Sequence, residues 1–224
     1  TVNPTPNSGV TVGGTTTFCS GGSVTLTSQA SSGTYLWSNG ETTQSITVNQ
    51  TGNYSVTVTD NGCSATSGST AVTVNQTPTA TITPQGNTIF CQGGFVVLQA
   101  SGAGTYQWNT GSQSSSINVS QSGTYSVIVT DNGCTDQTSQ TVTVNPLPTV
   151  TLASINDVCE NATAVSLTGG MPMGGSYTVN GTPSTELNPS VTGSGAQTVA
   201  YEYTDNNGCT NSATQTVTVN ATPN

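Results

Sequence analysis

The stretch GNYSVTVTDNGC at residues 52–63 returns as GTYSVIVTDNGC at residues 123–134, 71 positions further along the chain. Self-similarity at a fixed spacing is the sequence signature of a repeat architecture. Apolar residues alternate with hydroxyl residues along the first copy, a pattern that predicts a half-buried strand. Near its end each copy has Asn-Gly, which favours a type I′ hairpin turn at Asn61-Gly62 and at Asn132-Gly133.

Other landmarks recur at a spacing of 71 or 72 residues. Phe18-Cys19 matches Phe90-Cys91, and Trp37 matches Trp108. A third repeat is more divergent, but it keeps Cys159 and the Gly208-Cys209 pair. The predicted organisation is a tail of a preceding repeat with its linker at 1–6, repeats at 7–75, 76–145 and 146–220, and the start of a next linker at 221–224. We therefore expect further repeats on both sides.

Each repeat is predicted to be an all-β, immunoglobulin-like antiparallel β-sandwich, because short strands alternate with turn residues. The strands expected in the first repeat are 10–12, 23–27, 34–38, 45–49, 53–59 and 70–74. The linkers are short and carry proline, which favours extended, semi-rigid connections. Three repeats in an extended array would span on the order of 100–120 Å, from strands rising about 3.3 Å per residue.

The composition excludes several classes of function. The chain has no Lys, Arg or His and nine Asp and Glu, for a net charge of −9. Without cationic side chains it has no groups to bind phosphates, so we expect no nucleic-acid partner. Anionic membrane surfaces would repel it. No imidazole or amine is present for acid–base or Schiff-base chemistry. No stretch is long and apolar enough for membrane insertion.

The six cysteines fall two to a repeat, which predicts one disulfide inside each repeat. The expected pairs are Cys19–Cys63, Cys91–Cys134 and Cys159–Cys209. On the chain-entropy model each closure would stabilise its repeat by roughly 4 kcal/mol. Zinc binding is the alternative, but no pair has the CxxC spacing and the chain has no His.

Trp37 and Trp108 follow Tyr35 and Tyr106 by two residues, so each pair shares one face of a strand. In the second repeat Gln107 lies between Tyr106 and Trp108, and a glutamine side chain prefers solvent. This predicts that the aromatic face points into the core. The alternative is that Trp37 and Trp108 are exposed and bind carbohydrate.

Carboxylates are the remaining candidates for chemistry. A disulfide between Cys159 and Cys209 would bring Asp157, Glu160 and Asp205 together, and clustered oxygen ligands can bind Ca²⁺. The alternative is that these acids are surface residues that only increase solubility. A glycosidase would need two carboxylates across a cleft, and no pair is marked as such, so we predict no enzyme and no cofactor other than this possible calcium.

The motifs Phe-Cys-x-Gly-Gly, Tyr-x-Trp, Gly-x-Tyr-Ser-Val and Thr-Asp-Asn-Gly-Cys resemble the tandem Ig-like and PKD-like repeats of giant secreted surface adhesins of Bacteroidota. The resemblance covers all three repeats. It implies export by the type IX secretion route, in some members a role in gliding motility, and no family-wide catalytic residues. Tyr54 and Tyr125 resemble an immunoglobulin tyrosine corner, which implies a place in the core.

The expected function is therefore that of a non-catalytic extracellular stalk or filament on the cell surface, which spaces or presents an adhesive tip. Its expected partners are neighbouring repeats of the same chain, with lateral self-association or surface glycans as further possibilities.

Overall fold

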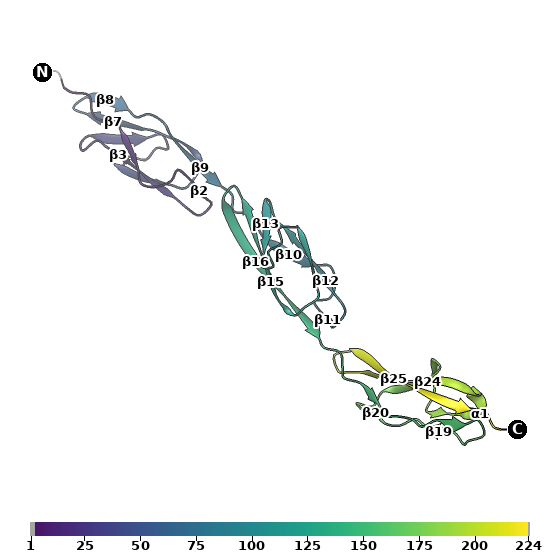
Figure 1. Cartoon of the computed structure of the whole chain (residues 1–224). Coiled ribbons are helices and arrows are strands. Elements are labelled where there is room, and N and C mark those ends of the chain that lie inside the picture. The colour runs from purple at the N-terminus through teal and green to yellow at the C-terminus, as the bar shows by residue number, and fades with distance from the viewer. Residues whose placement is uncertain (1–2, 224) are drawn as a thin grey trace. The chain divides into compact units, whose positions relative to one another are not determined.

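The structure, a computed structural model, describes residues 3–223 (Figure 1). It consists of β-strands with one single-turn helix, α1 (Pro189–Thr192), which confirms the predicted all-β class. The chain divides into two compact units. One contains the chain up to Thr83 with Leu98–Ile117 and Tyr125–Gln140, and the other contains Pro84–Val97, Asn118–Thr124 and the chain from Thr141 onward. The middle repeat thus contributes to both units.

The strands of the first repeat are β1 (Val10–Val12), β2 (Thr17–Cys19), β3 (Val24–Ser28), β4 (Thr34–Trp37), β5 (Ser45–Val48), β6 (Gly52–Tyr54), β7 (Val56–Asp60), β8 (Cys63–Thr66) and β9 (Thr70–Asn75). One face of the sandwich is a sheet of order β1-β3-β5, and the other is made of β2-β9-β6 and β4-β7-β8.

Alternation along the strands builds the core of the first repeat. Val24 and Leu26 of β3 are buried and meet Val56 and Val58 of β7 in one apolar cluster that also holds Trp37. The hydroxyl residues between them face outward and pair across strands. Examples are Thr27 Oγ1 with Ser45 Oγ at 2.9 Å and Thr57 Oγ1 with Thr66 Oγ1 at 2.9 Å. Such pairs stabilise a sheet face that lacks ion pairs.

The predicted type I′ turns are confirmed. Asn61 and Gly62 have φ of 47° and 78°, and Asn132 and Gly133 have φ of 47° and 82°. Positive φ at both central residues is what this turn requires, and Asn followed by Gly adopts it at low cost.

Two strands of the first repeat were not predicted. β2 pairs in parallel with β9, so that Cys19 lies opposite Asn75, and β8 pairs with β7 across the Asn61-Gly62 turn. β2 has only three residues, too few to show a period-2 pattern.

The strands of the middle repeat are β10 (Thr81–Pro84), β11 (Ile89–Cys91), β12 (Val96–Ser101), β13 (Thr105–Trp108), β14 (Ser116–Val119), β15 (Gly123–Asp131) and β16 (Cys134–Asn145). Their sheets have the orders β10-β12-β14 and β11-β16-β15-β13. These are the orders of the first repeat, with the last strands continuous instead of interrupted.

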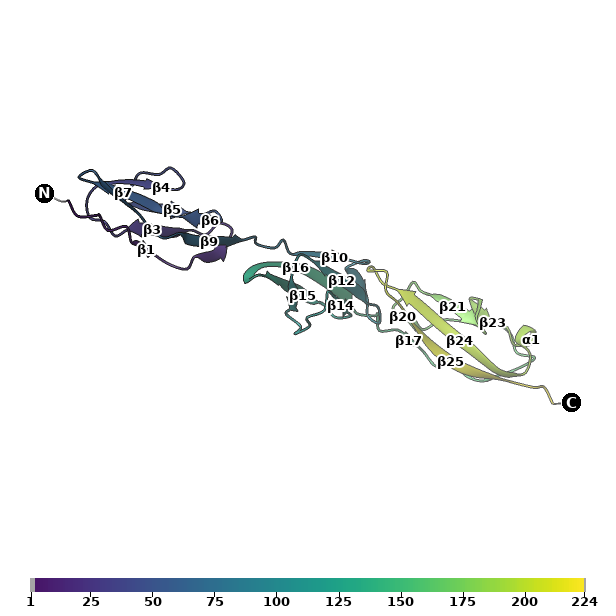
Figure 2. The same cartoon turned by 90° about the horizontal axis from the view of Figure 1, so that it is seen from above.

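The third repeat contains β17 (Thr151–Leu152), β18 (Val158–Cys159), β19 (Val165–Ser166), β20 (Gly170–Met171), β21 (Ser176–Val179), β22 (Thr182–Pro183), β23 (Glu186–Leu187), β24 (Gly195–Thr204) and β25 (Thr210–Asn220). Its main sheet has the order β18-β25-β24-β21-β22. The long hairpin of β24 and β25 dominates this repeat (Figure 2).

The third repeat replaces the core aromatics of the first. By strand register, Val179 stands where the first repeat has Trp37, and Tyr201 stands where it has Val58. The Tyr201 ring lies 4.6 Å from that of Tyr177, and a Cβ at Gly170 would lie 2.5 Å from the Tyr201 ring. The bulky side chain therefore lies on the neighbouring strand of the same sheet, and a glycine makes room for it.

The position of the corner tyrosine is also replaced. Tyr54 is buried, and its hydroxyl donates to Gln50 O, four residues upstream, at 3.0 Å. In the third repeat buried Gln197 donates from Nε2 to Gly193 O, also four residues upstream, at 3.1 Å. The carbonyl four residues upstream accepts a hydrogen bond in both repeats, from a tyrosine hydroxyl in the first and from a glutamine amide in the third.

The first prediction concerns the core. Trp37→Ala should lower the opening free energy of the first repeat by about 3–5 kcal/mol, because it empties a fully buried aromatic site. Leu36, its neighbour on β4, is 56% exposed, so Leu36→Ala should change that free energy by no more than about 0.5 kcal/mol. Hydrogen exchange of β3 and β7 in the whole chain measures both, and equal effects of the two variants would contradict the assigned core face.

Candidate functional site

The first cysteine of each repeat lies at the end of a short strand that runs parallel to the last strand. The register pairs Cys19 with Asn75, Cys91 with Asn145, and Cys159 with Asn220. The residue after each cysteine donates its N–H to that Asn carbonyl at 2.8 Å, from Ser20, Gln92 and Glu160 respectively. The first cysteine therefore sits where the chain leaves its repeat.

The second cysteine lies at the other end of the same strand. In the third repeat Cys209 directly precedes β25, whose 11 residues lead to Asn220. At about 3.3 Å per residue this strand separates the two cysteines by roughly 36 Å. A disulfide requires Cα atoms within about 7 Å. The two cysteines of one repeat therefore cannot form a disulfide with each other while the sandwich is folded.

The structure instead joins consecutive repeats. Cys19 is bonded to Cys134 and Cys91 to Cys209, with Cα–Cα distances of 5.6 and 5.5 Å. The predicted pairs Cys19–Cys63, Cys91–Cys134 and Cys159–Cys209 are therefore wrong. Cys63 and Cys159 are free thiols, the former partly buried and the latter exposed.

Side-chain hydrogen bonds flank the Cys19–Cys134 bond. Asn75 Nδ2 donates to Asn132 O at 2.8 Å, and Asn75 O lies 3.8 Å from Cys134 Sγ. Ser20 Oγ lies 2.9 Å from Thr77 Oγ1. Each disulfide joins the first cysteine of one repeat to the second cysteine of the next, and at this joint the Asn that ends the first repeat reaches the Asn-Gly turn of the middle repeat.

The tryptophans are not a sugar-binding surface. Trp37 and Trp108 are each 1% exposed. Their indole N–H groups donate to Thr43 O at 2.8 Å and Ser114 O at 2.9 Å. Of the two corner tyrosines, Tyr54 is buried and Tyr125 is partly buried. No ring face of these tryptophans is free for a ligand.

The proposed calcium ligands do not come together. Asp157 accepts a hydrogen bond from Thr218 N at 2.7 Å, at the end of β25 near Cys159. Asp205 accepts from Asn207 N at 2.8 Å and Cys209 N at 2.9 Å, in the turn at the start of β25. The expectation that Glu160 joins them rested on the wrong Cys159–Cys209 bond. Among residues 3–223 no group of three potential ligands is placed to hold a metal.

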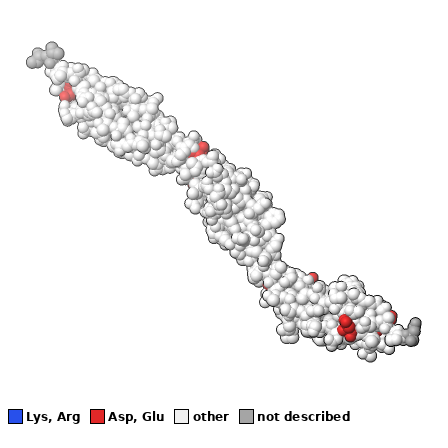
Figure 3. Space-filling model, in the orientation of Figure 1, with Lys and Arg blue, Asp and Glu red and all other residues white. Residues whose placement is uncertain are grey.

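Two acids outside the third repeat also accept hydrogen bonds from the backbone or from a nearby side chain. Asp136 accepts from Ala80 N at 2.8 Å, and Asp60 accepts from Ser32 Oγ at 2.9 Å. On the face shown in Figure 3 the acidic side chains are scattered over an otherwise uncharged surface. No helix among the described residues has the length and hydropathy to span a membrane.

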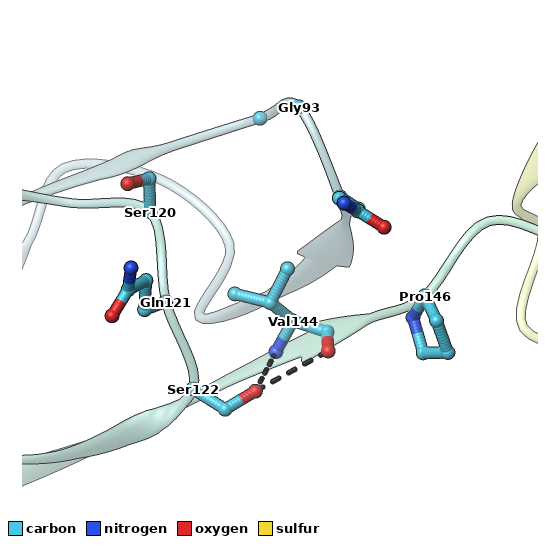
Figure 4. Close-up of a pocket in the computed structure, with 8 residues that line it drawn as sticks. Gly93, Ser120, Gln121, Ser122, Val144 and Pro146 are labelled. Carbon is cyan, nitrogen blue, oxygen red and sulfur yellow. Dashed lines mark hydrogen bonds between the residues drawn. The ribbon is translucent and has the colours of Figure 1, made fainter.

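A depression in the middle repeat carries no titratable side chain. Ser122 Oγ accepts from Val144 N at 2.8 Å and donates to Val144 O at 3.2 Å (Figure 4). Thr51 makes the same two bonds to Val74 in the first repeat, so this hydroxyl fastens a loop to the last strand. The lining residues are Gln92, Gly93, Gly94, Ser120, Gln121, Ser122, Val144 and Pro146.

No protein-family model and no curated protein sequence matches the chain. The N-terminal eight Ig domains of Down Syndrome Cell Adhesion Molecule (DSCAM) isoform 1.30.30 superpose with a TM-score of 0.53 at 11% identity. That superposition covers 92% of this chain, which spans 35% of the length of the other. It shows that the chain has the fold of tandem immunoglobulin-like domains.

Two further structures are similar at lower TM-scores. A three-Ig-domain structure of titin has a TM-score of 0.46 at 11% identity and covers 92% of this chain and 95% of its own. A Ca²⁺-stabilized adhesin that helps an Antarctic bacterium bind ice has a TM-score of 0.39 at 19% identity, covering 98% and 75%.

The second prediction concerns the bonds themselves. Peptide mapping of the monomeric chain without reduction should recover the bonds Cys19–Cys134 and Cys91–Cys209. Cys63 and Cys159 should be recovered as free thiols that react with an alkylating reagent. The physical reason is the separation of the cysteines of one repeat along its last strand. Recovery of any bridge inside a repeat would contradict the strand register described above.

Proposed function

We propose that the chain is a non-catalytic segment of an extracellular, repetitive adhesin, in which disulfide-jointed repeats form a stalk or filament that spaces or presents an adhesive tip. One observation carries this proposal, namely that the disulfides join consecutive repeats. A bond placed between repeats fixes the joint and transmits tension from one repeat to the next, which is what a spacer under load needs.

The covalent path through the chain supports this role. A chain pulled from both ends transmits force along its shortest covalent route. That route runs from Thr1 to Cys19, from Cys134 back to Cys91, and from Cys209 to Asn224, or 18, 43 and 15 residue steps. Most residues of the first and third repeats lie outside this route. Unfolding of either repeat would therefore lengthen the chain by less than the extended length of all the residues of that repeat.

The chemistry of the chain also fits an extracellular site. Disulfides persist in oxidising environments and are rare in the cytosol. The absence of Lys and Arg leaves a surface that would not bind nucleic acid or anionic lipid headgroups. The resemblance of its motifs to the repeats of Bacteroidota surface adhesins supports cell-surface placement, type IX secretion and a link to gliding motility.

The third prediction concerns shape. Small-angle scattering of the 224-residue chain should give a rod with a maximum dimension of about 100–120 Å, from three sandwiches of strands rising about 3.3 Å per residue. Breaking both joints with Cys19→Ser and Cys91→Ser should broaden the distribution of dimensions, because the proline-bearing linkers alone then hold the repeats. A particle of about 60–70 Å, as expected for one globule of this length, would remove the stalk proposal.

The fourth prediction concerns extension under force. With both disulfides intact, the fully stretched chain should reach only about 270 Å, and after reduction about 760 Å, at 3.3–3.6 Å per residue. A single-molecule pulling measurement with handles at the two ends gives both lengths. The double variant Cys63→Ser and Cys159→Ser is the matched control, since it removes the free thiols and leaves both joints. Equal lengths before and after reduction would show that the joints carry no load.

A further inference from the structure

One sheet of the first repeat ends at β5, beyond which the described residues place no further strand. Ser28 N donates to Gln44 O at 2.9 Å, which extends the antiparallel register of β3 and β5 by one residue. In such a pair the residues that exchange hydrogen bonds alternate with residues whose N–H and C=O point to the other side. The backbone groups of Ser45 and Thr47 therefore point away from β3. This row of outward groups is the open edge of the repeat.

The middle repeat has the same open edge at β14. Its sheet has the order β10-β12-β14, and Ala100 N donates to Ser115 O at 2.8 Å. By the same alternation, the backbone groups of Ser116 and Asn118 point away from β12.

Neither open edge carries the features that normally prevent strand pairing, which include charged side chains and proline. Segments 44–50 and 115–121 contain no charged residue and no proline. The outer edge of β4, by contrast, is closed by a turn. Trp37 N donates to Glu41 O at 2.8 Å, and Trp37 O accepts from Gly40 N at 2.9 Å. The first repeat thus closes the edge at β4 and leaves the edge at β5 open.

The third repeat closes the edge that corresponds to β5. Leu167 N donates to Thr185 O at 2.9 Å, so the backbone groups of Glu186 in β23 point outward. Ser184 Oγ accepts from Glu186 N at 3.3 Å and donates to Glu186 O at 2.6 Å. The Glu186 carboxylate and Pro189 add a charge and a proline to this edge. The open edge is therefore confined to the two repeats whose sequences match.

We infer that the open edge, at β5 in the first repeat and at β14 in the middle repeat, binds the same edge of a second copy of this chain by antiparallel strand pairing. Outward N–H and C=O groups at alternate residues are satisfied by an extended backbone. The same edge of a second copy, related by a two-fold axis, presents these groups in the complementary order.

The side chains and the lack of charge favour a second copy over a charged peptide. On the outer face Thr27 Oγ1 lies 2.9 Å from Ser45 Oγ, and Thr25 Oγ1 lies 3.5 Å from Thr47 Oγ1. A second copy would add a further row of such hydroxyl pairs. A charged peptide of either sign would lose solvation at this uncharged edge without meeting an opposite charge. The strand of a second copy carries no charge to desolvate.

The test is sedimentation velocity of the whole chain at concentrations up to about 1 mM, with the thiols of Cys63 and Cys159 blocked by iodoacetamide. The unaltered chain should form dimers and larger species as its concentration rises, because each copy has two open edges.

Two double variants should raise the dissociation constant roughly tenfold or more. Thr47→Pro with Asn118→Pro removes one outward N–H from each edge, a change that a solvent-facing edge position tolerates. Thr47→Lys with Asn118→Lys keeps both N–H groups and places like charges across the pair.

The matched control is Thr25→Lys with Ser101→Lys, which makes the same charge change on β3 and β12, the central strands of the two sheets. It should leave the dissociation constant within about twofold, as expected for surface substitutions away from a contact. Hydrogen exchange locates the contact, since the amides of Thr47 and Asn118 should become protected as the concentration rises.

Three outcomes would overturn the inference. These are a chain that stays monomeric at about 1 mM, an equal loss of affinity in the control variant, and association without protection of the two amides. None of them changes the length of a single chain at low concentration, so the stalk proposal is tested separately.

Discussion

A strand of two or three residues near the start of each repeat runs parallel to the last strand, and its register places the first cysteine beside the Asn that ends the repeat. Antiparallel pairing across the preceding turn places the second cysteine at the start of that same strand. The two thiols of a repeat are thereby held apart by the full length of a sandwich. Disulfides therefore form across the joints, and the joint becomes a built element of the fold instead of a flexible tether.

This arrangement leaves each sandwich to be stabilised without a covalent closure of its own. The chain has no cation to form an ion pair with its nine acids, so folding depends on buried apolar side chains and on cross-strand hydroxyl pairs such as Thr27 with Ser45. Small cores are marginal, which explains why the aromatic volume is kept when its position is not. Tyr201 in the third repeat supplies what Trp37 supplies in the first.

The period-2 pattern predicted the all-β class, six strands of the first repeat and the Asn-Gly turns, because each is a local property of a few residues. The disulfide partners are not local. Two cysteines per period are compatible with pairing within a repeat and with pairing between consecutive repeats, and the strand directions decide between the two. The missing signal was β2, too short to show a pattern. Its parallel pairing puts Cys19 at the opposite end from the Asn61-Gly62 turn, and the calcium prediction failed with the same assumption.

Pairing between repeats also has a consequence that pairing within repeats lacks. If each repeat closed its own disulfide, any number of repeats would be free of unpaired cysteines. When each bond joins the first cysteine of one repeat to the second cysteine of the next, a run of repeats has polarity and carries one unpaired cysteine of each type. Cys63 and Cys159 are these two in the present chain. Each of the two is therefore one half of the same kind of bond that joins consecutive repeats at Cys19–Cys134 and Cys91–Cys209.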